Sequence, residues 1–118
     1  MTYVDGFVLA VPTANKEAFR KLAEDVAVFF RKHGATSVVE CWGDDVPAGQ
    51  LTSFPMAVKC ADDETVVFSW VTWPDKETRD TGNKRVMEDL EAAGISPDDH
   101  PFDGKRMIFG GFQVLIDA

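Results

Sequence analysis

The chain has 118 residues, a formal net charge of −8 and a hydrophobic content of 45%. These values are typical of one domain, residues 1–118, that buries a core without disulfides or metals. The acidic excess repels polyanions, so the composition argues against a nucleic-acid partner. No apolar run approaches the roughly 20 residues of a membrane span, and the N-terminus has no secretory pattern. We therefore expect a cytoplasmic protein without a membrane partner.

The first part of the chain predicts a strand, a helix and a second strand. Residues 3–11 are rich in β-branched and aromatic side chains and end before a proline. Residues 14–33 carry apolar side chains at helical spacing, with Thr13 as the expected N-cap and Gly34 as the residue that ends the helix. Residues 36–43 alternate in the manner of a second strand.

A loop and a third strand follow. Residues 44–54 contain proline and glycine without a periodic pattern, which predicts a long loop, and loops of this kind are often functional. Residues 56–59 fit a short strand or a turn equally well. Residues 65–73 predict the third strand, again apolar on both faces.

The last part of the chain predicts a helix and a final strand. Asp75 is the expected cap of a helix that extends to about residue 93 and ends at Gly94. Gly82 lies inside this helix, where it either lets the first turns fray or allows close packing. The final strand is expected from about residue 106 to residue 116, with a glycine pair inside it.

The order β-α-β-β-α-β predicts an α+β fold of the ferredoxin-like type. In it, four antiparallel strands form one sheet and both helices lie on one face. The first and third strands are apolar on both sides, so the uncovered face needs a partner. A second copy of the chain is the simplest candidate, which predicts a homodimer with its sheets face to face.

Sorting the strands by alternation separates a face of small side chains from a face of large ones. We assign the helices to the small face, which contains Val4, Gly6, Val8, Ala10, Val39 and Cys41. Polar groups among large aromatics are typical of a lined cavity. The candidate ligand-binding residues are therefore Tyr3, Asp5, Phe7, Glu40, Trp42, Ser69, Trp73 and Arg106. Buried carboxylates need a partner, and we expect Arg106 to pair with Asp5 or Glu40.

Four strings spread along the chain resemble one family. They are YVDGF at residues 3–7, VECWGDD at 39–45, VVFSW at 66–70 and PFDGKRMIFGGF at 101–112. With these strings the chain is similar to the YbaA-like family of small uncharacterised bacterial proteins. The resemblance implies membership of the dimeric α+β barrel superfamily, in which two ferredoxin-like units close a barrel through their sheets. That superfamily includes cofactor-free monooxygenases, haem-handling enzymes and lactone isomerases, but the resemblance carries over no catalytic residue.

The residues with intrinsic chemistry favour no metal or cofactor site. The acidic run beside Glu40 lacks the converging ligands that a metal requires. Cys41 is expected under the helices, where a thiol is inert. His33 lies at a helix C-terminus, which favours a capping or packing role, and His100 lies in a loop.

Three functions remain open from the sequence. The favoured one is a homodimer that binds a small molecule in the barrel cavity. The first alternative is a cofactor-independent enzyme, of monooxygenase or isomerase type, that uses a cavity carboxylate as a base. The second is a purely structural dimer whose polar residues satisfy one another.

Overall fold

The structure is a computed structural model that describes residues 1–95 and 101–118. Its strands are β1 (Tyr3–Pro12), β2 (Ser37–Trp42), β3 (Glu64–Trp73) and β4 (Ile108–Gln113). Its helices are α1 (Lys16–Lys32), α2 (Phe54–Ala57) and α3 (Lys76–Ala92), with short 3₁₀ turns η1 (Thr13–Asn15) and η2 (Gly104–Arg106). The predicted β-α-β-β-α-β order is confirmed, with α2 as an addition inside the long loop.

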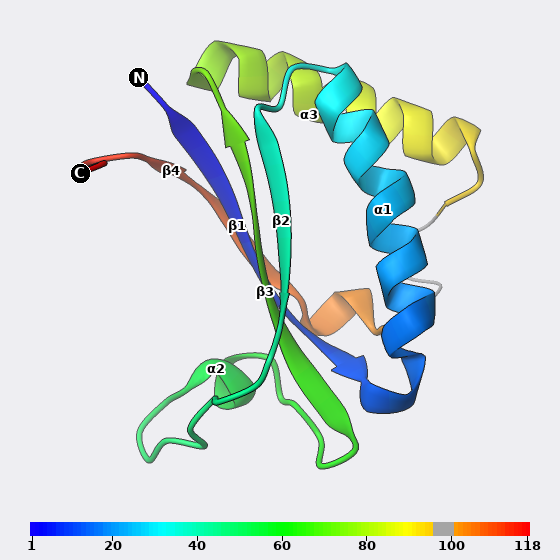
Figure 1. The fold of residues 1–118 in the computed structure, drawn as a ribbon, viewed down its shortest axis with the longest axis vertical. Coiled ribbons are helices and arrows are strands. Elements are labelled where there is room, and N and C mark those ends of the chain that lie inside the picture. Colours follow the sequence, from blue (N-terminus) through cyan, green and yellow to red (C-terminus); the bar gives the residue numbers. More distant parts are fainter. Residues whose placement is uncertain (96–100) are drawn as a thin grey trace.

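The four strands form one antiparallel sheet in the order β2-β3-β1-β4. The pairs Tyr3–Trp73 and Glu40–Ser69 are direct cross-strand neighbours. Helices α1 and α3 both lie against one face of the sheet, and α2 with its loop projects from the opposite side at one end (Figure 1). The predicted layer arrangement is therefore confirmed.

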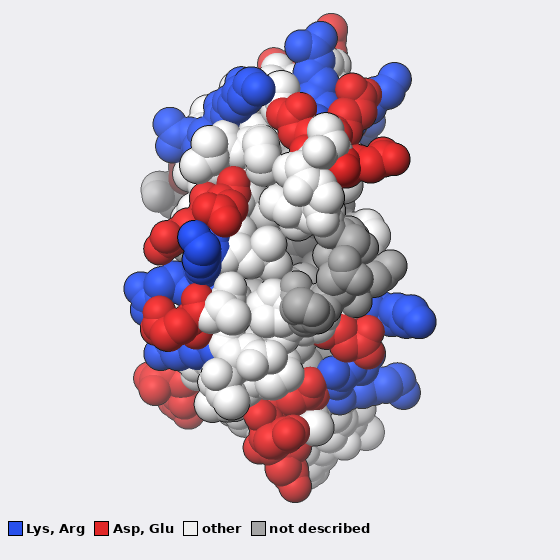
Figure 2. Space-filling view, turned by 90° about the vertical axis from the view of Figure 1, so that its right-hand side faces the viewer, with Lys and Arg blue, Asp and Glu red and all other residues white. Residues whose placement is uncertain are grey.

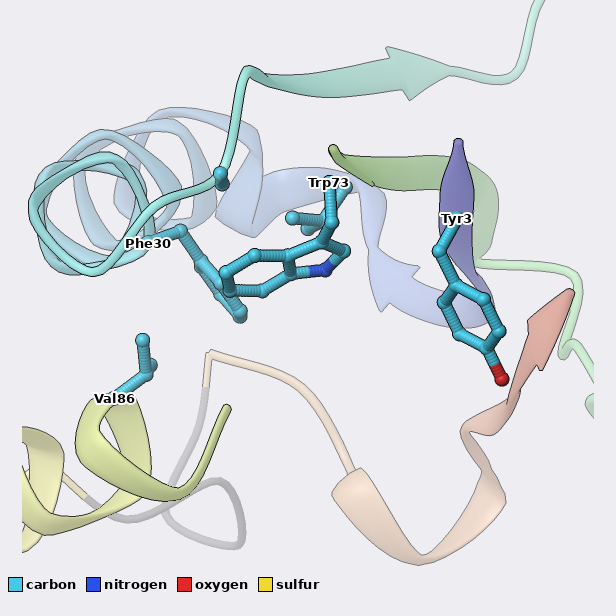
Figure 3. Close-up of a cluster of buried hydrophobic side chains, with 6 residues drawn as sticks. Tyr3, Phe30, Trp73 and Val86 are labelled. Atoms are coloured by element: carbon cyan, nitrogen blue, oxygen red, sulfur yellow. The ribbon is translucent and has the colours of Figure 1, made fainter. Parts of the chain in front are cut away.

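The helices cover the face with the large side chains, so our assignment of the small face to the helices is wrong. Phe30 of α1 meets Trp73 edge-on, with ring centroids 6.0 Å apart, and Val86 of α3 belongs to the same buried cluster. Figure 3 shows Trp73 lying between Phe30 and Tyr3. Large side chains are needed here because they fill the space between the sheet and the helices at crystal-like packing density.

The face of small residues is covered only in part. Val8, Ala10 and Val66 pack with Val58 from the segment after α2. At the other end, the Phe112 ring lies over two glycines, 3.7 Å from where a Cβ of Gly6 would stand and 3.5 Å from that of Gly110. This contact explains Gly110, the first member of the glycine pair, because backbone without a side chain accommodates an aromatic ring.

Both long helices begin and end at recognisable signals. Asp75 caps α3 as predicted, because its carboxylate accepts a hydrogen bond from the Thr78 backbone N–H at 2.7 Å. Thr13 does not cap α1: its hydroxyl lies 2.7 Å from that of Thr65, and η1 comes before the helix. Gly34 and Gly94 follow the two helices with positive φ, as expected of helix-ending glycines.

Two segments differ from their predicted form. Residues 56–59, left open between strand and turn, lie at the end of α2 and in the turn after it, with Ser53 as the cap. The final strand is shorter than predicted, since β4 contains only Ile108–Gln113 and Arg106 belongs to η2. The C-terminal residues beyond β4 stay close to β1 at their start, where the Val114 N–H donates to the Thr2 carbonyl at 3.1 Å.

Gly82 is the contact point between α3 and the rest of the core. A Cβ at this position would lie 2.7 Å from the His33 carbonyl oxygen and would collide with the Trp73 ring. Alanine normally stabilises a helix by about 1 kcal/mol relative to glycine. We expect the opposite sign for Gly82→Ala, a net loss of about 1–2 kcal/mol, because overpacking costs about 1–3 kcal/mol.

Urea unfolding followed by tryptophan fluorescence measures this change. Thr81→Ala is the matched control, because Thr81 is exposed at the neighbouring position of the same helix. It should leave stability unchanged or slightly higher. A Gly82→Ala protein more stable than the wild type would contradict the close packing.

Candidate functional site

The eight predicted cavity residues fall into three separate groups. The first group is an ion pair between Asp5 and Arg79 of α3, with Tyr3 and Trp73 beside it. The second group lies around hollows beneath α1 and consists of Phe7, Glu40, Ser69 and Trp42. Arg106 stands apart on η2. Because the large-residue face lies under the helices, these hollows are between the helices and the sheet rather than between two sheets.

Asp5 is buried, with 3% of its surface exposed, and each of its neighbours donates to it. Arg79 Nη2 donates to its carboxylate at 2.7 Å, Trp73 Nε1 at 3.0 Å and Asn83 Nδ2 at 3.2 Å. The Arg79 guanidinium also lies 5.1 Å from the centroid of the Tyr3 ring. A carboxylate satisfied in this way fixes α3 on the sheet and leaves little capacity for a ligand.

The second glycine of the β4 pair makes room for this ion pair. A Cβ on Gly111 would lie 2.8 Å from Arg79 Nη2 and from the Tyr3 ring. Sequence reasoning missed Arg79 and Asn83 as partners of Asp5. Arg79, Asn83 and the apolar Val86 follow one another at helical spacing, which places all three on the side of α3 that packs against the sheet. This spacing could have identified the two polar residues as partners of a buried carboxylate.

Arg106 does not pair with Asp5 or Glu40, so that prediction is wrong. Its guanidinium forms a bidentate ion pair with Glu64: Nη2 donates to Oε2 at 2.7 Å, and Nη1 donates to Oε1 at 2.8 Å. Arg106 Nε also donates to Asp103 at 3.1 Å. This cation fastens η2 to the start of β3, and it lowers the pKa of Glu64 chiefly through the hydrogen bond between them.

Beneath α1 lies a pocket of about 160 Å³, which we call the apolar pocket. It is bordered by α1, α3, the sheet and the segment around η2, and it is partly open to solvent. Its lining consists of Phe7, Leu9, Phe19, Leu22, Ala23, Val26, Phe30, Glu40, Ser69, Val71, Met87, Leu90, Ile95, Phe102 and Met107. Only Glu40 and Ser69 among these are polar, so the pocket combines a large apolar wall with one polar corner.

A second hollow of about 330 Å³, the outer groove, lies between α1 and the edge strand β2. Its lining consists of Lys16, Phe19, Arg20, Ala23, Glu24, Ala27, Val38, Glu40, Cys41, Trp42 and Val67. Lys16 lies over the Trp42 ring, 5.4 Å from its centroid. The groove and the apolar pocket share Phe19, Ala23 and Glu40, which places the Glu40 side chain where the two hollows meet.

Glu40 has the most distinctive electrostatics of the predicted residues. Glu40 is exposed to solvent on the edge strand β2, although protein atoms crowd one side of its carboxyl. Partial burial raises its pKa from 4.5 to about 7, while a hydrogen bond from Ser69 opposes the rise. A carboxyl with this pKa takes up and releases protons near neutral pH.

His33 and the two cysteines contribute no further site. His33 Nε2 lies 2.6 Å from a carboxylate oxygen of Asp89 on α3, so it joins the two helices, in keeping with the expected packing role. His100 lies outside the described residues. Cys41 is half-buried beside the outer groove rather than under the helices, which corrects that expectation, and Cys60 is also unpaired.

Residues 1–95 and 101–118 contain neither a cluster of metal-ligating side chains nor a membrane-spanning helix. No three His, Cys, Asp or Glu side chains in that part of the chain are grouped as metal ligands would be. No described helix has the length and apolarity to cross a membrane.

Comparison with known proteins places the chain among close relatives. A family model described as "Protein of unknown function (DUF1428)" matches residues 2–104. The chain is 50% identical over 117 residues to the uncharacterized protein YbaA of Escherichia coli strain K12, with 99% of both chains covered. The YbaA protein of Shigella flexneri matches with the same identity and coverage.

A solved structure shares the fold. It is a dimeric ferredoxin-like protein from an uncultured marine organism, with a TM-score of 0.56 and 9% sequence identity. The alignment covers 99% of this chain and 98% of that chain. At this identity the likeness shows the fold alone, which is ferredoxin-like, and says nothing about chemistry.

Proposed function

This chain belongs to the DUF1428 family together with the YbaA proteins, and we propose that it binds a small molecule in the apolar pocket and acts as a homodimer. The observation that carries the binding proposal is the position of Glu40. It places one ionisable carboxyl at the polar corner of an apolar pocket and at the junction with the outer groove. Concave apolar sites with few convergent polar groups and a perturbed pKa are the usual form of ligand sites.

Thermal-shift screening of the full chain against small aromatic and aliphatic compounds tests the binding proposal. Ligands of the apolar pocket should raise the melting temperature of the wild type. The shift should shrink in Glu40→Gln and disappear in Ala23→Phe, because a phenyl group at position 23 occupies space shared by both hollows.

Glu88→Gln is the control for loss of a carboxylate, since Glu88 is exposed on α3 away from both hollows. It should keep the full shift. Hits that are insensitive to both pocket variants would place binding elsewhere. An absence of hits in a protein that remains dimeric would favour a purely structural dimer.

The pKa of Glu40 favours proton transfer as a second candidate function. An ionised Glu40 in an apolar setting could remove a proton from carbon next to a ligand carbonyl, which leaves an enolate in the pocket. Exchange of that hydrogen for deuterium in D₂O, followed by NMR on a bound ketone, tests this step. Exchange should stop in Glu40→Gln, and equal rates in both proteins would exclude the role.

The open sheet face supports the homodimer. Large apolar side chains on it remain exposed, with Phe112 at 62%, Ile108 at 45% and Phe68 at 43%. Register places all three on the side that the long helices leave uncovered. A second copy is the partner that a single chain always has available, and a two-fold contact would bury the same residues on both sides.

Phe112→Asp should convert the dimer to a monomer at micromolar concentration, because a charge at the centre of an apolar interface is left without a partner. Size-exclusion chromatography with light scattering measures the mass. Val28→Asp is the control, since Val28 is 65% exposed but lies on α1. A wild-type protein that is already monomeric would refute the dimer proposal.

We also propose that the protein works in the cytoplasm. Both cysteines are unpaired, as is usual for proteins of reducing compartments. A fusion to a reporter that is fluorescent only in the cytoplasm would test this location in a bacterial host.

A further inference from the structure

We propose that the ligand of the apolar pocket is a small neutral aromatic compound with a hydroxyl group, of the phenol class, whose hydroxyl donates to the Glu40 carboxylate. This inference rests on the proposed binding function and specifies the chemistry that the same pocket recognises. It follows from the wall, the volume and the charges of the pocket.

The wall favours an aromatic ring. Four phenylalanines line the pocket: Phe7 from β1, Phe19 and Phe30 from α1, and Phe102 from the segment before η2. Phe19 and Phe102 meet edge-on with their centroids 5.8 Å apart. Rings that already pack in this geometry offer faces and edges to a further ring, and such pairs contribute about 0.5–1.5 kcal/mol beyond the area they bury.

The volume limits the ligand to about one ring. At about 160 Å³ the apolar pocket matches the engineered cavity of roughly 150 Å³ that binds benzene in another protein. A fused or heavily substituted ring system would have to extend through the Glu40 junction into the outer groove.

The charges exclude an ionic ligand inside the pocket. Among its described lining residues, Glu40 is the only ionisable one. A carboxylate there would face Glu40 with no cation among the described lining residues, and an ammonium ion would lose its hydration for a single partner. Figure 2 shows the side of the protein that carries the long helices, where uncharged side chains lie between groups of charged ones.

The polar corner fits one hydroxyl group. Glu40 and Ser69 are directly opposite on β2 and β3, and Ser69 already donates to the carboxyl. An ionised carboxylate has about four acceptor positions, so a ligand hydroxyl can donate to a free one. A site of this kind favours a ligand with the hydroxyl over an analogue that lacks it, because the analogue forgoes a hydrogen bond to a charged acceptor.

Four ring compounds of similar size test the inference on the full-length protein: phenol, toluene, benzoate and benzylamine. In a saturation-transfer NMR titration at pH 8, phenol should bind at least about tenfold more tightly than toluene. The two ions, benzoate and benzylamine, should not bind. In Glu40→Gln the preference for phenol over toluene should fall, while Glu88→Gln should retain it. Circular dichroism confirms that each variant is folded.

The pH dependence provides a second readout. A hydroxyl donor binds the ionised carboxylate, so the affinity for phenol should rise between pH 6 and pH 8, as Glu40 loses its proton with a pKa of about 7. The other charged groups that face Glu40 are Lys16, Arg20 and Glu24 of α1, across the groove. Toluene has no hydroxyl to donate to Glu40, so its binding should not change with pH.

The outcomes separate the two proposals. Toluene as tight as phenol, or benzylamine as the tightest ligand with a dependence on Glu40, would overturn the phenol inference and leave the pocket as a binding site. Failure of all four compounds to bind would overturn both. Phenol binding that is unchanged in Ala23→Phe and Glu40→Gln would also overturn both, because it would lie outside the pocket.

Discussion

Replacing Asp5 by alanine is expected to lower the free energy of unfolding by about 3–5 kcal/mol, which corresponds to roughly 10–20 °C in melting temperature. The change removes the acceptor of Arg79, Trp73 and Asn83 at once. The Arg79 side chain is only 23% exposed, so its charge would be left in a poorly hydrated position. Denaturant unfolding with tryptophan emission as the signal measures the loss.

A double-mutant cycle identifies the cause of that loss. Arg79→Met alone should also destabilise, since it leaves the Asp5 carboxylate without its cation. The double variant should lose less than the sum of the two single variants, because neither charge is then unpaired. Asp80→Ala is the control, as this exposed carboxylate contacts the same guanidinium from the solvent side and should have no measurable effect. Additive losses would show that Asp5 and Arg79 act independently.

The order of strands and helices along the chain could be predicted from local patterns alone. Alternation sorted β1 and β3 into two correct sets of side chains, and the terminating glycines and Asp75 marked the helix ends. Which set the helices cover could not be predicted in this way, because both sets are apolar and packing decides between them. We assigned the small residues to the helices, whereas Trp73 and Phe30 show that the interlayer space requires large ones.

The candidate site shows a similar division. Glu40 and Ser69 were recognised as polar residues among aromatics, and the structure brings them together on neighbouring strands. Asp5 shared their pattern but has a different environment, since its partners Arg79 and Asn83 come from a helix about 75 residues away. The last strand was expected to contain Arg106, and its place in the topology suggested Arg106 as the cation. The bidentate ion pair of Arg106 with Glu64 depends on η2, a turn that no periodic pattern indicates.

The correction of the face also changes how dimer and ligand are related. A ligand between two sheets would require the dimer, and dissociation would abolish binding. The apolar pocket instead lies within one chain, on the side of the sheet away from the exposed Phe112. We therefore expect a monomeric Phe112→Asp protein to retain pocket ligands, so that binding and assembly can be measured separately.

Arg106→Met is expected to destabilise the protein by about 2 kcal/mol at pH 7, less than the loss for a fully buried pair because Arg106 is 25% exposed. Most of this loss of stability comes from the partner carboxylate, Glu64, which is left without its cation. The Glu64 side chain is 8% exposed and would keep only its hydrogen bond from the Ala61 N–H and the solvent near it. Methionine retains the length and the apolar stem of arginine, so packing is largely preserved.

The pH dependence of this loss separates charge pairing from packing. Arg106 lowers the pKa of Glu64 below its ordinary 4.5 in the folded state, so the pair contributes fully above that value and loses its contribution as pH falls through the folded pKa. The gap in stability between wild type and Arg106→Met should therefore be constant from pH 6 to pH 8 and shrink below about pH 4. Asp103→Asn, which removes the more exposed partner of Arg106, should produce a smaller gap. A gap that stays constant down to pH 3 would mean that the arginine stem, rather than its charge, holds η2 against β3.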